Sequence, residues 1–203
     1  MIADEPADNF QYLCLLDKGD GPDGDRCYDA VARRYRQNPS CRILLVEPRI
    51  LRLVEVGVLP SFDALSRREL GKRGLPLGII SLLPSDGGDY WAAARTLRAW
   101  LADRPNATVL VFCGRFSSAH LRSLLNLALG SAQAARVRLQ ALPSRRYDET
   151  DWWTSRSGIK GFGIEVLRQL CGWCAGGDHP PWHPCSADDY ERHVRQALLE
   201  AAP

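Results

Sequence analysis

The residues best suited to chemistry gather in one stretch, 143–158, between an apolar strand-like segment and an apolar helical pattern. This stretch holds three arginines, several carboxylates and the adjacent tryptophans Trp152 and Trp153. Because neighbouring side chains point in different directions on a regular backbone, the two indoles cannot both face one core. One of them is therefore expected at the surface or in a ligand cleft. Since guanidinium groups bind anions and indoles stack on flat groups, we predict a recognition loop that binds a ligand through Trp152, Trp153 and Arg156.

A second candidate is the turn at 17–26, which is rich in Gly and Asp, follows an apolar run and opens a helical pattern. Glycines let backbone N–H groups approach a phosphate or carboxylate, and a helix N-terminus attracts negative charge. Lys18 and Arg26 are predicted to contact an anion, whereas Asp17 and Asp20 are predicted to hold a ribose hydroxyl or an ion. The spacing fits neither the dinucleotide fingerprint nor the Walker loop, so a solvated turn remains the alternative.

A third candidate is the strand-to-helix turn within 113–122, which carries two hydroxyls, a histidine and two arginines. Arg115 is the best ligand-binding candidate there, because open parallel sheets bind ligands at the carboxyl ends of their strands. Ser117 is predicted either to bind an anion at the helix start or to cap the helix, and Arg122 to add a second cation. Histidine titrates near neutral pH, so His120 suits acid–base chemistry, with a place on a helix face as the alternative.

A possible metal site lies near the C-terminus, where a Cys-x2-Cys pair precedes two histidines and a further cysteine. Thiolate and imidazole ligands suit zinc, and this first spacing is common in structural zinc sites. The second half fits no standard zinc spacing, so a metal-free turn region remains open beside a zinc site. The candidate ligands are Cys171, Cys174, His179, His183 and Cys185.

The elements that must position these groups alternate between short apolar runs and longer helical patterns. Nearly continuous apolar runs are typical of strands buried on both faces, and we expect them at 12–16, 43–46, 77–82, 108–113 and 137–142. Apolar residues at helical spacing predict helices at 25–37, 61–73, 89–103, 117–129, 158–171 and 187–201. Gly74 and Gly130 are expected to end two of these helices. The alternation predicts a three-layer α/β fold, with a mostly parallel five-stranded sheet and helices on both faces.

Composition narrows the class of protein further. The 26 basic and 24 acidic residues nearly balance, so charge gives no argument for a nucleic-acid or membrane-surface partner. No apolar run approaches the roughly 20 residues that span a bilayer, and the N-terminus lacks the pattern of a signal peptide. We therefore expect a cytoplasmic protein with a disordered tail at 1–9, one α/β domain at 10–174, and a linker rich in Gly and Pro followed by a helix at 175–203. The cysteines expected to act as small buried hydrophobes are Cys14, Cys27, Cys41 and Cys113.

The order of these features resembles the ElyC/SanA/YdcF family of bacterial proteins over about residues 10–173. The resemblance rests on the turn before Arg26, on Gly74-Leu75-Pro76 before the third strand, on the helices at 90–101 and ending at Arg122, and above all on one motif. That motif is Trp152-Trp153-Thr154-Ser155-Arg156-Ser157-Gly158, similar to the family's Trp-Trp-x-Ser-Arg-x-Gly. The positions that match the family are Arg26, Arg122, Trp152, Trp153, Ser155 and Arg156.

This resemblance implies a Rossmann-like α/β fold. Members of the family are linked to bacterial envelope biogenesis, and one soluble member is associated with S-adenosylmethionine binding. The chain also departs from the family pattern. Glu47-Pro48 replaces a Gly-Gly turn, the turn after the third strand keeps only Ser85 of its hydroxyls, and His120 is displaced by about one helical turn.

Two functions are therefore predicted. The first is a small-molecule-binding α/β protein that binds or acts on an anionic ligand, either nucleotide-like (S-adenosylmethionine or a nucleotide) or a sugar phosphate. The second is a non-catalytic accessory or interaction protein of envelope or polysaccharide biogenesis, in which the family fold is kept and the site has eroded. The departures from the family pattern favour the second, whereas the clustered arginines and indoles favour the first.

Overall fold

The computed structural model describes residues 10–16, 22–47, 54, 57, 60–85, 90–143, 151–156, 158–163, 166 and 167. The chain divides into two compact units, Met1–Val166 and Leu167–Pro203, and every element named below belongs to the first. The expected N-terminal tail, the linker and helix at 175–203, and the zinc candidates lie outside the described residues. Within the described part of the chain, no helix is both long and apolar enough to cross a membrane.

Five parallel strands form a single sheet in the order β3-β2-β1-β4-β5. The strands are β1 (Tyr12–Leu16), β2 (Arg42–Glu47), β3 (Ile80–Pro84), β4 (Val109–Gly114) and β5 (Val137–Leu142). The chain starts at the centre of the sheet, runs outward to β3, and then crosses back to β4 on the other side of β1. The strand order therefore reverses between β1 and β4, and the carboxyl ends of these two strands flank the point where ligands bind in folds of this kind.

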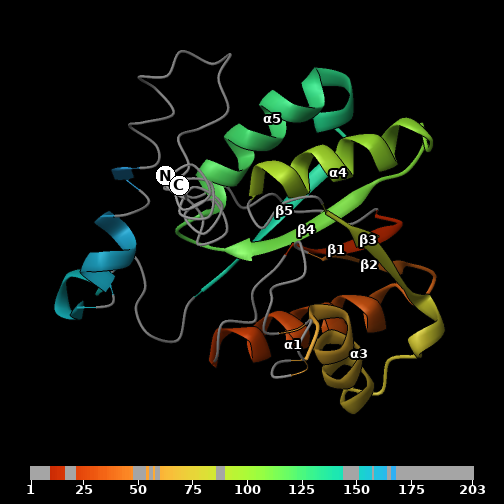
Figure 1. Ribbon diagram of the computed structural model, residues 1–203, viewed down its shortest axis with the longest axis horizontal. Coiled ribbons are helices and arrows are strands. Elements are labelled where there is room, and N and C mark those ends of the chain that lie inside the picture. Colours follow the sequence, from red (N-terminus) through yellow and green to blue (C-terminus); the bar gives the residue numbers. More distant parts are fainter. Residues whose placement is uncertain are drawn as a thin grey trace, which may run out of the picture. The chain divides into compact units, whose positions relative to one another are not determined.

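Helices cover both faces of the sheet, as Figure 1 shows. On one face lie α1 (Pro22–Gln37) and α3 (Phe62–Lys72), and on the other lie α4 (Tyr90–Ala102) and α5 (Ser118–Ala134). Alternate residues of β1 serve the two faces, because Leu13 and Leu15 pack in one core while Cys14 and Leu16 pack in the other. The predicted three-layer α/β, Rossmann-like architecture with a parallel sheet is thus confirmed.

The prediction for the third strand was wrong in its position. Residues Leu77–Ile79 form a 3-10 turn, and β3 begins at Ile80 instead of residue 77. Pro76 lacks an N–H group for a strand ladder, and its carbonyl accepts from Ile79 N at 3.3 Å, which closes the turn. The expectation that this strand is buried on both faces was also wrong, because β3 is an edge strand with Leu82 37% exposed.

The free edges of the sheet are each capped by an arginine from a neighbouring helix. Arg67 of α3 donates to Ile80 O at 3.4 Å, and Arg122 of α5 donates to Val137 O at 3.0 Å. Each carbonyl belongs to the first residue of an edge strand and, by the alternation of a parallel ladder, points away from the sheet. Pro84 ends β3 without an N–H group to offer at that edge.

The two glycines expected to end helices both have the left-handed backbone that favours glycine. Gly74 follows α3 with φ 78°, and its N–H group donates to Gly71 O at 2.9 Å. Gly130 has φ 69°, which kinks the helix. About one further helical turn follows the kink, and α5 ends at Ala134. Gly130 therefore ends the first part of α5, as predicted, and a short second part of the helix follows it.

The cysteines behave as the composition predicts. Cys14, Cys41 and Cys113 are buried free thiols, and Cys27 is partly buried. Burial raises the pKa of Cys41 to about 11 and that of Cys27 to about 12. Because these two thiols stay protonated at neutral pH, they are small core groups and not nucleophiles.

Arg73, which follows α3, ties that helix to α1. Its Nε donates to Asp29 Oδ1 at 2.7 Å, and its NH1 meets Glu69 Oε2 at 3.1 Å. The guanidinium also lies 5.6 Å from the centroid of the Tyr28 ring, and Tyr28 shares a buried hydrogen bond of 3.0 Å with Ser66. With a side chain only 17% exposed, Arg73 holds these charge-assisted contacts more firmly than a fully solvated pair would.

We expect Arg73→Met to lower the free energy of unfolding by about 1–2 kcal/mol, because it removes charged hydrogen bonds between two helices. Arg68→Met is the matched control, since the Arg68 side chain is 64% exposed and its ion pair is longer, with 3.4 Å between its Nε and Glu69 Oε1. This control is expected to change stability by less than about 0.5 kcal/mol. Urea unfolding followed by circular dichroism measures both, and equal losses in the two variants would contradict the role of Arg73.

Glu69, which pairs with Arg73 at the same interface, makes part of the stability of the fold depend on pH. Lys72 donates to Glu69 Oε1 at 2.7 Å and, with Arg73 beside it, holds the pKa of Glu69 below its ordinary value of 4.5. A depressed pKa stabilises the fold above the unfolded value, and this contribution is lost as pH falls through the folded value. The stability difference between wild type and Glu69→Gln is therefore expected in full at pH 7, should begin to shrink as pH falls towards 4.5, and should vanish only below the lowered pKa of the folded state. Urea unfolding across this pH range tests it; a difference that does not change with pH would contradict the assignment.

Candidate functional site

The turn from β4 into α5 is held by hydrogen bonds to its own backbone. Ser117 Oγ donates to Gly114 O at 3.1 Å, and Ser118 Oγ donates to Arg115 O at 2.7 Å. Ser117 occupies the N-cap position of α5, yet its side chain makes no capping bond there. Both hydroxyl protons are therefore directed at the turn itself, and Ser118 is fully buried. An anion would find no hydroxyl donor here without a rearrangement.

Arg26 and Arg115 are brought to the same end of β5. Arg115 N donates to Leu142 O at 2.9 Å, which extends the β4–β5 pairing past the last strand residue. Arg26, in the second turn of α1, donates from NH1 to Pro143 O at 3.0 Å. Two arginines from different elements thus attach to consecutive residues at the carboxyl edge of the sheet, near the start of α1. The sequence predicted both as ligand-binding residues, and the structure brings both to the same end of β5.

Arg122 lies apart from Arg26 and Arg115, because its guanidinium donates to Val137 O at the other end of β5. Val137 begins β5, whereas Pro143 follows its end, so the two carbonyls are separated by the full strand, about 20 Å. Arg122 instead lines an open cleft of about 540 Å³ beside α5 and β5. The other residues that line it are Asn126, Ser131, Ala134, Ala135, Val137 and Arg138. The structure therefore separates Arg122 from Arg26 and Arg115.

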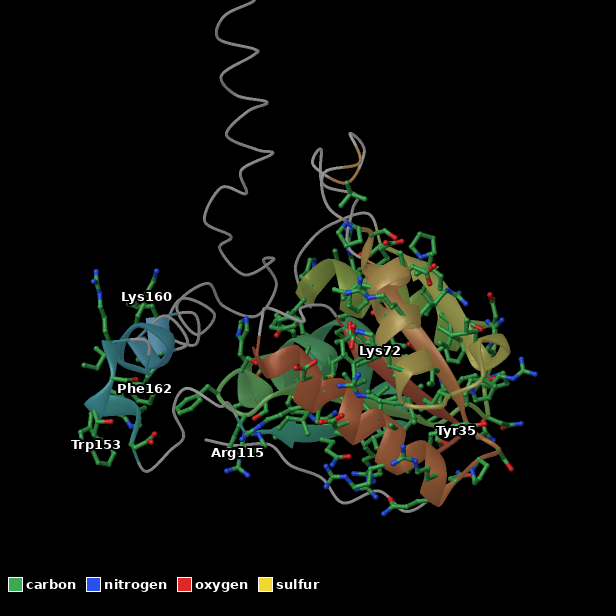
Figure 2. The ribbon with its side chains drawn as sticks, turned by 90° about the horizontal axis from the view of Figure 1, so that it is seen from below. Tyr35, Lys72, Arg115, Trp153, Lys160 and Phe162 are labelled. Atoms are coloured by element: carbon green, nitrogen blue, oxygen red, sulfur yellow. The ribbon has the colours of Figure 1, made fainter. Side chains whose placement is uncertain are left out.

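The two tryptophans divide their roles, as expected from their adjacency. Trp152 stacks on Phe162 with ring centroids 3.9 Å apart and planes inclined by 20°. Phe162 in turn meets Phe116, the neighbour of Arg115, at 6.3 Å. Trp153 is 56% exposed, and Figure 2 shows it on the same segment as Phe162 and Lys160. Trp152 is thus an internal packing residue, and Trp153 is the indole left for a ligand or a partner.

The rest of the motif builds the turn that follows. Ser155 Oγ accepts from Gly158 N at 2.9 Å, and Ser155 O accepts from Ile159 N at 3.0 Å, so Ser155 starts the next helical turn. A Cβ atom on Gly158 would lie 2.8 Å from Trp152 Cα and closer still to its carbonyl oxygen. The motif therefore needs Ser155 and Gly158 for local structure. Arg156, which is exposed, remains a ligand-binding candidate.

Glu47 is a carboxyl-edge residue that the sequence reasoning did not select. It ends β2, and its Oε1 accepts from Asp63 N at 3.3 Å, in the first turn of α3. Ser85 N donates to Glu47 O at 2.9 Å, which fixes the backbone at this point. An acidic residue at the end of the second strand of a predicted parallel sheet was the signal that would have identified it.

Several predicted site residues lie outside the described part of the chain. These are Asp17, Lys18 and Asp20 in the first turn, and the zinc candidates Cys171, Cys174, His179, His183 and Cys185. Among the described residues, no three His, Cys, Asp or Glu side chains are grouped so as to hold a metal ion. The described part of the candidate site consists of Arg26, Arg115, Glu47 and the segment that carries Trp152 and Phe162.

The fold and this site define a three-layer, Rossmann-like α/β protein with a cationic carboxyl edge. No protein-family model, curated protein or solved structure matches the chain.

The role of Gly158 leads to a local stability prediction. Gly158→Ala is expected to push the backbone of Trp152 away and to break the stack on Phe162, because the added methyl group has no space. Amide hydrogen exchange of residues 151–163 should rise at least about tenfold, while exchange in the sheet stays unchanged. Gly163→Ala is the matched control, since a Cβ there meets nothing within 4 Å. Equal exchange in both variants would show that the close approach is not required.

Proposed function

We propose that this chain is a small-molecule-binding α/β protein whose ligand is anionic and nucleotide-like, such as a nucleotide or S-adenosylmethionine, or else a sugar phosphate. The observation that carries the proposal is the meeting of Arg26 and Arg115 at the carboxyl end of β5. Arg26 brings its guanidinium to this carboxyl end, and Arg115 follows β4 at the same edge, where parallel α/β sheets receive their ligands. The proposal places the protein in the cytoplasm.

The electrostatics of the surrounding backbone support an anion at this edge. The start of α1 carries the positive end of the helix dipole, which attracts negative charge. Arg26 lies one turn into that helix, so its charge adds to the dipole instead of opposing it. Arginine offers a planar fork of donors that fits carboxylate and phosphate oxygens in pairs. In this proposal Arg26 and Arg115 neutralise the anion.

The exposed side chains of the following segment supply the second half of the proposed site. Trp153 offers a flat apolar face, and Arg156 a further cation, within four residues of each other. A base or similar flat group stacks on an indole with a gain of about 1–3 kcal/mol per contact. The resemblance to the ElyC/SanA/YdcF family belongs to the same proposal, because the Trp-Trp motif is shared and one family member is associated with S-adenosylmethionine.

A ligand panel tests this function directly. We expect one of ATP, ADP, S-adenosylmethionine or glucose 1-phosphate to raise the melting temperature, because a ligand that binds only the native state stabilises it. Arg26→Met should weaken the binding of that ligand about tenfold or more, through the loss of a charged hydrogen bond.

Arg33→Met is the matched control for this experiment. Arg33 is an exposed arginine of the same helix, and it lies about two helical turns further along α1 than Arg26. Its replacement removes the same charge and should change affinity less than about twofold. The absence of a shift with every ligand of the panel would overturn the proposed function, and equal effects of the two variants would overturn the role of Arg26.

A second candidate function is a non-catalytic accessory or interaction protein of envelope or polysaccharide biogenesis. Its support is the exposure of large apolar side chains after β5, where Trp153 is 56% and Ile159 53% exposed. Apolar groups gathered on a surface favour association with other molecules. The double variant Trp153→Ser, Ile159→Ser discriminates between the two functions. It should weaken ligand binding if Trp153 belongs to a ligand site, and leave ligand binding unchanged if the segment serves association.

A further inference from the structure

Glu47 lies at the carboxyl end of β2, beside the central strand of the sheet. Its strand, β2, pairs directly with β1, and Val46 is aligned with Leu16, the last residue of β1. Glu47 is therefore one residue beyond the end of β1 and next to the point where the strand order reverses. In doubly wound sheets, an acidic side chain after the second strand accepts hydrogen bonds from ribose hydroxyls, because ribose lies beside the first strand.

The direction of the Glu47 side chain agrees with such a role. Ile43 and Leu45, its alternate neighbours in β2, pack in the core shared with α1 and α3, so Glu47 points to that face. Its hydrogen bond from Asp63 N at 3.3 Å confirms this orientation. The helix α1 that carries Arg26 covers the same face, which places the carboxylate and this arginine on one side of the sheet edge.

The acceptor capacity of Glu47 is only partly used. A carboxylate has about four lone-pair positions, and the backbone N–H group of Asp63 occupies one of them. The remaining positions suit O–H donors. A carboxylate suits a vicinal diol in particular, because its two oxygens accept from both hydroxyls. An anionic group of a ligand would be repelled here and attracted to Arg26 and Arg115 instead.

The separation of the two charges constrains the shape of the ligand. From β2 to β5 the sheet spans three strand spacings, or about 14 Å. A ligand that contacts both ends therefore needs hydroxyl groups and an anionic group on separate parts of the molecule. Ribonucleotides have this arrangement, with the ribose hydroxyls apart from the phosphate chain.

We infer that Glu47 binds the ribose of a ribonucleotide-like ligand, with its carboxylate accepting the 2′- and 3′-hydroxyl groups while Arg26 and Arg115 receive the anionic end. This inference rests on the proposed function and deepens it, because it names the ribose as the group that Glu47 binds and selects ribonucleotides over deoxynucleotides. It also assigns the ribose to Glu47 instead of Asp17 or Asp20.

The test compares ADP with 2′-deoxy-ADP by titration calorimetry on the full chain. Wild type should bind ADP about tenfold or more tightly than 2′-deoxy-ADP, since the lost hydroxyl leaves a carboxylate without its charged hydrogen bond. This comparison needs no variant, so it stands even if a variant fails to fold. Equal affinities for the two nucleotides would overturn the inference about Glu47 while leaving the proposed function in place.

Glu47→Gln provides the second arm, because the amide oxygen still accepts from Asp63 N. The variant should weaken ADP about tenfold and change 2′-deoxy-ADP less than about twofold. Equal losses for both nucleotides would mean that Glu47 acts through α3 and does not contact ribose. Asp103→Asn controls for the change of charge, because Asp103 is an exposed acid after α4 at the opposite end of the sheet.

Failure of wild type to bind ADP, 2′-deoxy-ADP and S-adenosylmethionine would overturn both the inference and the nucleotide-like form of the proposed function. Binding of glucose 1-phosphate alone would overturn the inference and keep the function.

Discussion

The pairing of β1 with strands on both sides is the constraint on which the rest of this structure depends. A strand at the centre of a parallel sheet exposes apolar residues to both faces, and burial of both requires a layer of helices on each. Since parallel neighbours need crossover connections, α1 and α3 cover one face and α4 and α5 the other. The return crossover to β4 creates the reversal of strand order beside β1. The position of the cationic edge and of Glu47 follows from that single topological event.

Much of this architecture was predictable because burial leaves a strong mark on sequence. The strands β1 and β5 were bounded correctly, since β1 is a short run of mostly apolar residues and β5 alternates apolar with polar residues. The start of β3 could not be inferred in the same way, because Leu77 and Ile79 look like strand residues until Pro76 closes a turn with Ile79. The sequence also does not show that β3 lies at an edge. Strand order is decided by long-range pairing, which residue patterns along the chain do not encode.

The candidate site was predictable as a set of chemical groups, but not as a geometry. Arg26 and Arg115 were both selected, and only the structure shows that they bond to consecutive residues, Leu142 and Pro143, at the end of β5. Arg122 looked equivalent because it follows the same turn, yet its long side chain reaches back to the start of β5. In the Trp-Trp motif, close backbone packing accounts for Gly158 and a helix cap for Ser155. A motif that looks like a binding signature is therefore partly a folding signature, and Trp153 and Arg156 are the residues that local structure does not require.

The arginine caps at the sheet edges have a consequence for how this protein meets others of its kind. An open sheet offers unpaired backbone groups on its outermost strands, and these groups template strand exchange and fibril-like stacking between molecules. Arg67 and Arg122 each occupy an outward carbonyl with a charged group, and Pro84 withholds an N–H group from the β3 edge. A second chain that approached along either edge would have to displace a guanidinium and accept its charge into the growing ladder. The fold thereby keeps a five-stranded sheet finite without closing it into a barrel.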